Sequence, residues 1–479
     1  MAGLGRAEEH SEVVAHHYLQ AIEYGRVAGG VDPVLEERAR HALRTAADRA
    51  LALNAFAAAA RFYRGALELW PEKDPGRAYV LFGLGAARNW TDDAVADLEE
   101  ARDELLKQGD REKAAEAEAL ASFHTGSTET SLMRLKQALE LVRDRPPSRS
   151  KALVLARLAY RAASVGDPVW EQRAKEALAM AELLRLDDLR ASVLITMGTA
   201  AMKGPAGMAP LEQAVEVADA IDSPESILAR INLGAVLQLQ GDLQRCFEVQ
   251  AKARSDAARF GVRDWIRHLR VELVWEQYWR GLWDESNHEA DAVIAELVPN
   301  QDPVAQIACH YLRAHMRLAR DNVGGAMADA EEAVRAARMW PTWGNLGTAV
   351  SGLARVLLAG GRREDANTLV TELLELEPDW YALPDLAVCL VGLDRADQLQ
   401  PVSDAFETSV WLDAAKAFAA GDYTSAADIY ADMGSLPDEA DARLRSGIEA
   451  EVLRALEFYR SVGATRYIRD GEALLAASA

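Results

Sequence analysis

The residues of this chain best suited to binding chemistry are aromatic side chains between positions 265 and 283. That stretch holds Trp265, Trp275, Trp279 and Trp283, four of the 11 tryptophans, together with Tyr278. Large aromatic side chains on a rigid concave surface are typical of sites that bind a peptide or a small ligand. In a narrow, closed interior the same residues would serve packing alone. The sequence leaves both interpretations open.

No pattern for catalysis, a cofactor or a metal accompanies this stretch. The chain contains no GxGxxG dinucleotide loop, no GxxxxGK[ST] phosphate loop and no GxSxG nucleophile motif. Its three cysteines, Cys246, Cys309 and Cys389, form no CxxC pair and lack the spacing of a zinc site. We therefore expect a protein that is not an enzyme and that uses no catalytic residue, cofactor or metal.

The charge balance disfavours polyanionic partners. Lysine and arginine number 53 against 75 aspartates and glutamates, a formal net charge of −22. Such a chain repels nucleic-acid phosphate and anionic lipid. The N-terminus turns polar before an apolar signal segment forms, and no stretch of 18 uncharged apolar residues follows. We expect a cytoplasmic protein with a protein or peptide partner, or a small ligand, and neither nucleic acid nor membrane.

The elements that position the aromatic stretch are helices arranged as a repeat. Apolar residues recur at helical spacing, and short breaks such as QGD, AGGR and AGDY separate the segments. If Gly126, Gly166, Gly241, Gly281, Asp321 and Gly361 mark turns, the gaps between them are 40, 75, 40, 40 and 40 residues. The long gap predicts one more turn near residues 204–207. The period is therefore about 40 residues.

Small residues occupy fixed positions relative to these turns. Asn54 and Gly421 extend the set of turns at its two ends. Seven residues before the turns stand Ala47, Ala119, Ala159, Gly234, Val274, Ala314, Ala354 and Ala414, of which seven are small. Five residues after them stand Ala59, Ser131, Cys246, Ser286, Ala326, Ala366 and Ala426, and the exception is Glu171 after Gly166. Small side chains let two antiparallel helices approach closely where they cross. The pattern predicts stacked helical hairpins.

Two units resemble the second half of a tetratricopeptide repeat (TPR). Ala59, Tyr63, Ala66 and Pro71 share one spacing with the corresponding residues of EDANTLVTELLELEP, which ends at Pro378. Proline ends the helix in both because it cannot continue one. We therefore expect an all-α fold, a right-handed superhelical α-solenoid of antiparallel helix pairs that is TPR-like with a period of about 40 residues and has 24 to 26 helices.

The TPR resemblance implies which residues face the concave groove. Offsets from the small residues Val274 and Ala314 select positions on two adjacent first helices of hairpins. The candidate ligand-binding or partner-binding residues are His268, Val271, Trp275, Tyr278, Trp279, Tyr311 and His315. If the groove is open, the last five of these side chains should be partly exposed to solvent.

The period divides the chain into three parts. Residues 1–53 are expected to form an N-terminal helical pair or cap, and residues 54–378 a TPR-like solenoid. Residues 379–479 begin with an irregular break, since Gly361 and Gly421 lie 60 rather than 40 residues apart. One further TPR-like unit and C-terminal capping helices complete that last part.

Four stretches resemble a known family: AEEHSEVVAHHYLQAIEYGR, RALALNAFAAAARFYRGALELWP, AAGDYTSAADIYADMGSLPDEADARLR and FYRSVGATRYIRDGEALLAA. They are similar to the C-terminal TPR region of bacterial signalling proteins that join a class III adenylate/guanylate cyclase domain and an AAA/STAND ATPase to a TPR array. The family's nucleotide-binding motifs have no counterpart in this sequence.

Together these features predict a non-catalytic TPR-type protein- or ligand-interaction and sensor module of a bacterial signalling system. The alternative is the regulatory half of a nucleotide cyclase or STAND ATPase, active only with a separate catalytic half.

Overall fold

The structure, a computed structural model, describes residues 11–27, 29–91, 93–124, 127–202, 205–297, 302–339, 345–376, 380–399 and 409–478. Over these ranges the chain forms 25 α-helices joined by short turns and contains no β-strand. The predicted all-α solenoid class and helix number are confirmed. Among the same residues, no helix combines the length and apolar character needed to cross a membrane.

The chain divides into two compact units. The first comprises residues 1–202, 206–232 and 253–265, and the second comprises 203–205, 233–252 and 266–479. The division therefore falls inside the stretch 54–378 that the sequence assigns to a solenoid. The three-part organisation expected from the sequence stays a prediction.

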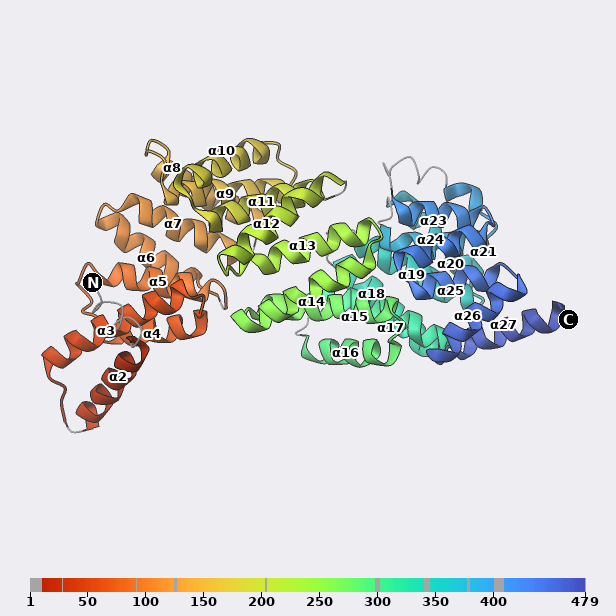
Figure 1. The fold of residues 1–479 in the computed structure, drawn as a ribbon, viewed down its shortest axis with the longest axis horizontal. Helices are drawn as coiled ribbons and strands as arrows, with labels where there is room; N and C mark the ends of the chain where they lie inside the picture. Colours follow the sequence, from red (N-terminus) through yellow and green to blue (C-terminus); the bar gives the residue numbers. More distant parts are fainter. Residues whose placement is uncertain are drawn as a thin grey trace. The chain divides into compact units, whose positions relative to one another are not determined.

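In the first unit each helix packs against the next one along the chain (Figure 1). First helices also contact one another, as α7 contacts α9 and α9 contacts α11, which is the stacking expected of a solenoid. The helices are α2 (Ser11–Val27), α3 (Pro33–Ala52), α4 (Phe56–Glu68), α5 (Arg77–Arg88), α6 (Val95–Lys107), α7 (Arg111–Ala121), α8 (Thr128–Val142), α9 (Arg149–Ser164), α10 (Val169–Leu184), α11 (Asp187–Ala200) and α12 (Met208–Ala220).

Three helices contribute residues to both units: α13 (Glu225–Leu239), α14 (Leu243–Phe260) and α15 (Arg263–Trp279). The second unit continues with α16 (Trp283–Glu296), α17 (Pro303–Ala319), α18 (Val323–Met339), α19 (Asn345–Ala359), α20 (Arg363–Glu375), α21 (Leu383–Gly392), α23 (Val410–Ala419), α24 (Tyr423–Met433), α25 (Leu436–Arg445), α26 (Glu449–Ser461) and α27 (Thr465–Ser478). Neighbours along this series again pack on each other, and α19 contacts both α17 and α21.

The turns lie where the 40-residue period places them. A left-handed backbone (φ between 56° and 81°) occurs at Asn54, Gly166, Gly241, Gly281, Asp321, Gly361 and Gly421. Each of these residues separates the two helices of a hairpin. The turn expected near residues 204–207 falls between α11 and α12, and Gly126 lies outside the described residues.

The small residues on either side of the turns lie where paired helices cross. The Ser286 hydroxyl donates a hydrogen bond to the Val274 carbonyl at 2.9 Å, so these two positions of one hairpin are in direct contact. Ala314, Ala354 and Ala326 are at most 1% exposed. A much larger side chain at these three alanines would push the helices apart.

In the second unit, the C-terminal helices pack against the turns of the repeats. A Cβ atom added to Gly241 would lie 2.6 Å from Val410 and 2.8 Å from Met433. At Gly281 it would lie 2.8 Å from Phe458. Glycine is therefore required at these two turns for space as well as for its positive φ.

Candidate functional site

Helices α15 and α17 bring five of the seven candidate residues together. The ring of Trp275 lies 5.0 Å from that of Trp279 and 5.5 Å from that of Tyr311. Tyr278 meets His315 edge to face at 6.3 Å, and Tyr311 lies 4.4 Å from His315. These five side chains are called the inner cluster below.

The other two candidates lie nearer the N-terminus of α15. Val271 is buried in the apolar core of the second unit. The His268 Nε2 atom lies 3.8 Å from a Glu272 carboxylate oxygen, and this histidine is partly exposed.

The prediction that the side chains of the inner cluster are partly exposed to solvent is wrong. Trp275 and Tyr278 are 8% exposed, His315 7%, Tyr311 6% and Trp279 2%. The cause lies in the C-terminal part of the same unit, whose aromatic side chains cover α15. Tyr381 lies 4.9 Å from Trp275, and Trp411 lies 6.1 Å from Trp279, ring to ring. The repeat period predicts an open array of hairpins and does not specify that later aromatic side chains pack over α15.

A buried carboxylate links the inner cluster to α21. Asp385, 1% exposed, accepts hydrogen bonds from the Tyr311 hydroxyl at 2.9 Å and from Arg355 Nη1 at 2.8 Å. The His315 Nε2 atom lies 2.9 Å from the same carboxylate, and its Nδ1 atom lies 2.9 Å from the Tyr311 carbonyl oxygen. Both ring nitrogens therefore face acceptors. A ring with an N–H on each nitrogen would satisfy both contacts.

The charges around Asp385 form a compensated network. Burial alone would raise the pKa of Asp385, but the His315 and Arg355 cations outweigh it and hold the pKa well below its usual range. Arg355 also reaches Asp441 at 3.1 Å, and Arg445 lies 3.3 Å from the other Asp441 oxygen. Buried charges of both signs are thereby paired, which a low-dielectric interior demands.

Two small cavities adjoin the inner cluster. Each has a volume of about 20 Å³, room for one water molecule. Tyr278, His315 and Asp438 line both of them. Asp438 accepts a hydrogen bond from the Ser435 hydroxyl at 2.5 Å, and burial raises the pKa of this carboxyl group to about 6. A ligand larger than water enters only if lining side chains move.

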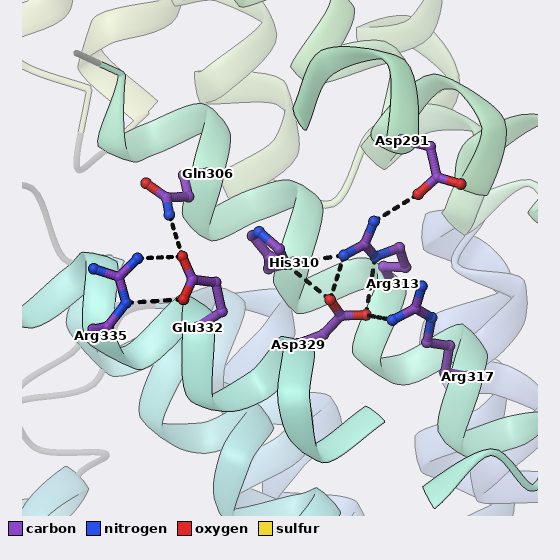
Figure 2. Close-up of polar contacts among 8 residues, drawn as sticks. All are labelled: Asp291, Gln306, His310, Arg313, Arg317, Asp329, Glu332 and Arg335. Carbon is purple, nitrogen blue, oxygen red and sulfur yellow. Dashed lines mark hydrogen bonds and ion pairs between the residues drawn. The ribbon is translucent and has the colours of Figure 1, made fainter. Parts of the chain in front are cut away.

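A second buried carboxylate organises the outward side of α17 (Figure 2). Asp329 of α18 is 3% exposed and accepts from Arg313 Nε at 2.9 Å and Arg317 Nη1 at 2.6 Å. The His310 Nδ1 atom lies 2.9 Å from it, and Arg313 also bonds Asp291 at 2.6 Å. Burial would raise the pKa of Asp329, but these neighbours hold it below its usual value. The network ties α16, α17 and α18 together and adjoins no described cavity.

Sequence reasoning missed Arg355, Asp385, Asp438, Trp380 and Tyr381. Trp380, Tyr381 and Asp385 lie in the stretch that breaks the repeat period, and Asp438 lies on α25. Arg355 lies on α19 one residue after Ala354, the offset that Trp275 has from Val274 and His315 from Ala314, so the register itself was a signal for this residue. A usable signal was the sequence WYALPD at 380–385, an aromatic pair followed by an acid in an otherwise apolar segment. Within the described residues no cluster of three histidine, cysteine, aspartate or glutamate side chains could hold a metal ion.

Comparisons with known proteins yield structural likenesses only. No family model matches the chain, and no curated protein matches its sequence. Among solved structures, Cut9 in the APC/C Cut9–Hcn1 hetero-tetramer matches over 91% of this chain and 87% of its own (15% identity, TM-score 0.42). A Rap protein complexed with competence and sporulation factor matches over 75% and 99% (12% identity, 0.42), and yeast Tom70 over 92% and 97% (14%, 0.35). At these values the fold assignment rests on the helix pairs described above.

Proposed function

We propose that this protein is a non-catalytic TPR-type module that binds a protein or peptide partner and relays this binding within a bacterial signalling system. The observation that carries the proposal is the aromatic inner face of α15, where the rings of Trp275 and Trp279 already hold Tyr381, a residue from a distant part of the same chain. The partner-binding residues are His268, Val271 and the inner cluster.

A peptide partner suits this surface better than a nucleic acid. The net charge of −22 opposes binding of phosphate backbones and anionic membranes. Once exposed, the aromatic and hydrogen-bonding groups of the inner cluster would complement a peptide segment. A small ligand is the other candidate, and it would have to enlarge the water-sized cavities.

The cytoplasm is the compartment we propose. Cys246, Cys309 and Cys389 are buried and form no disulfide with one another. Burial raises the pKa of the Cys309 thiol to about 12, so it stays protonated and unreactive. Buried thiols of this kind suit a reducing compartment.

The resemblance of four stretches to cyclase and STAND signalling proteins supports the signalling role. It also favours the second candidate, a regulatory half of a nucleotide cyclase or STAND ATPase that acts with a separate catalytic half. The two candidates differ in the partner, which in the second case carries the nucleotide chemistry.

Cross-linking of the intact protein in a bacterial lysate, followed by mass spectrometry, tests the proposal. We expect cross-links from the second unit to a defined protein partner. If that partner holds a cyclase or ATPase domain, the second candidate is correct. Isothermal titration should show no saturable ATP or GTP binding to the purified chain, and micromolar binding would contradict a non-catalytic role.

A further inference from the structure

Trp380 and Tyr381 form the outer edge of the aromatic cluster in the second unit. They belong to a short 3-10 turn, η3 (Trp380–Ala382), and their rings stack at 3.5 Å. Trp380 lies 5.2 Å from Trp411, and Tyr381 lies 4.9 Å from Trp275. Both residues of the pair are only partly buried, whereas the rings beneath them are almost fully buried.

A polar contact fixes the position of the pair. The Tyr381 hydroxyl donates to the Gln238 side-chain oxygen at 2.9 Å. Gln238 is 2% exposed and has two further contacts: its side-chain nitrogen donates to Glu272 at 2.9 Å, and its backbone carbonyl accepts from Trp411 Nε1 at 2.7 Å. The acceptor for the tyrosine is thus preorganised by residues outside η3.

The pair is separable from the helix that follows it. Leu383 and Leu386 of α21 are fully buried, and Asp385 is held by three donors. Ala382, the last residue of η3, is also fully buried, so the firm anchor of this segment to the core begins directly after the pair. By contrast, Trp380 and Tyr381 are only partly buried, and their rings cover a cavity lined by Trp279, Asp385 and Asp438.

We propose that Trp380 and Tyr381 act as an internal occupant of the partner-binding surface. The inference rests on the proposed function. The partner contributes a peptide segment with two adjacent aromatic residues, which replaces this pair: one ring stacks on Trp411, and a tyrosine stacks between Trp275 and Trp279 with its hydroxyl on Gln238. The chain's own pair competes with the partner and sets the threshold for binding.

The test uses the full chain and a peptide of known sequence. The probe is fluorescein-labelled Asp-Trp-Tyr-Ala-Leu, the chain's residues 379–383. It is titrated by fluorescence anisotropy against the natural protein and against the double variant Trp380→Ala/Tyr381→Ala. We expect the Kd for the double variant to be at least tenfold lower than for the natural chain. The control peptide Asp-Ala-Ala-Ala-Leu should bind neither protein.

Equal affinity of the probe for the two proteins, or no binding to a double variant whose circular dichroism is native, would overturn the inference. If the double variant fails to fold, Tyr381→Phe is tested instead. This substitution removes only the hydroxyl group that donates a hydrogen bond to Gln238. The probe should then bind several-fold more tightly than to the natural chain, and unchanged affinity would refute the competition.

Cross-linking to the partner, done with both the natural chain and the double variant, distinguishes failure of this inference from failure of the proposed function. If the natural chain and the double variant capture the partner equally, the function stands and the internal occupant does not. If the probe binds the variant but neither protein captures a partner, the occupant is supported and the signalling function fails.

Discussion

At the scale of single residues, the second unit depends on charges that are buried and compensated. The Asp385 carboxylate forms hydrogen bonds with His315, Arg355 and Tyr311. Arg355 also forms an ion pair with Asp441. Removing one member of such a network leaves its partners charged in a low-dielectric interior, which costs more than the lost contact itself.

Asp385→Asn should therefore lower the free energy of unfolding by about 3 to 5 kcal/mol. The substitution keeps the shape of the side chain and removes the charge that His315 and Arg355 share. Urea unfolding followed by tryptophan fluorescence measures the effect. Asp394→Asn is the matched control, because the Asp394 side chain is 88% exposed in its ion pair with Arg363 and should cost less than about 1 kcal/mol. Similar losses for both variants would contradict the network's role.

Asp438 should make stability depend on pH. Burial raises its pKa from 3.8 to about 6, with Ser435, Arg355, Asp385 and Asp441 around it. The protonated form is therefore favoured by folding, so its contribution is full below about pH 4 and is lost as pH rises through 6. The loss amounts to at most about 3 kcal/mol.

The variant Asp438→Asn isolates this effect. Relative to the natural chain, it should gain stability progressively between about pH 4 and pH 7 and show no further relative change above that range. Thermal unfolding across this range measures the difference between the two proteins. Asp432→Asn, at an exposed position of α24, serves as the control and should follow the natural chain. Parallel curves for Asp438→Asn and the natural chain would refute the prediction.

At the scale of helices, the hairpin crossings are closed by small residues. Ala314 and Ala354 lie on α17 and α19, are at most 1% exposed, and face their paired helices. A tryptophan at either position cannot be accommodated in a packed crossing without separating the helices.

Ala314→Trp and Ala354→Trp should each destabilise the protein by more than about 2 kcal/mol. Thermal unfolding by circular dichroism gives the comparison. Ala251→Trp on the exposed face of α14 controls for the presence of a tryptophan in a helix and should leave the midpoint nearly unchanged. Unaltered midpoints for both core variants would mean that the repeat register is wrong.

The turns of the repeats allow a second comparison between helices. Gly281 and Gly361 both have positive φ, at 72° and 81°. An added Cβ at Gly281 would lie 2.8 Å from Phe458, whereas at Gly361 nothing lies within 4 Å. Both alanine variants carry the same backbone strain, and only the first meets a packed side chain.

Gly281→Ala should therefore cost about 1 to 3 kcal/mol more than Gly361→Ala. The difference, measured by urea unfolding, reports how tightly α26 packs against the turn between α15 and α16. Equal losses of unfolding free energy for the two variants would show that α26 does not pack against this turn. The C-terminal helices would then not cover the repeats of the second unit as described.

At the scale of the whole molecule, two units use one type of repeat. In the second unit, the helices after residue 379 pack on the repeats that precede them, so the inner faces of α15 and α17 become interior. The aromatic residues there serve packing in this state. Their proposed recognition role requires release of the partly buried pair at η3.

The sequence alone determined the helical class, the turns and the small residues of the crossings. These features depend on contacts between residues close in the chain. Any hairpin of this kind needs a residue with positive φ at its turn, as at Gly281, and a small residue where its helices cross, as at Ser286. The juxtaposition of Trp275, Tyr311 and His315 followed from the same register, because adjacent repeats are related by one fixed period.

Only the tertiary structure decided the environment of those residues. Tyr381 and Asp385 come from the stretch that departs from the period, and Trp411 comes from the repeat unit that follows it. These residues reach α15 and α17 across intervals of about 70 to 130 residues. No local pattern encodes such contacts, because they depend on how the helices of the second unit pack on one another. The burial of Trp279 and the pairing of His315 with Asp385 were therefore determined by long-range packing, which a repeat period does not specify.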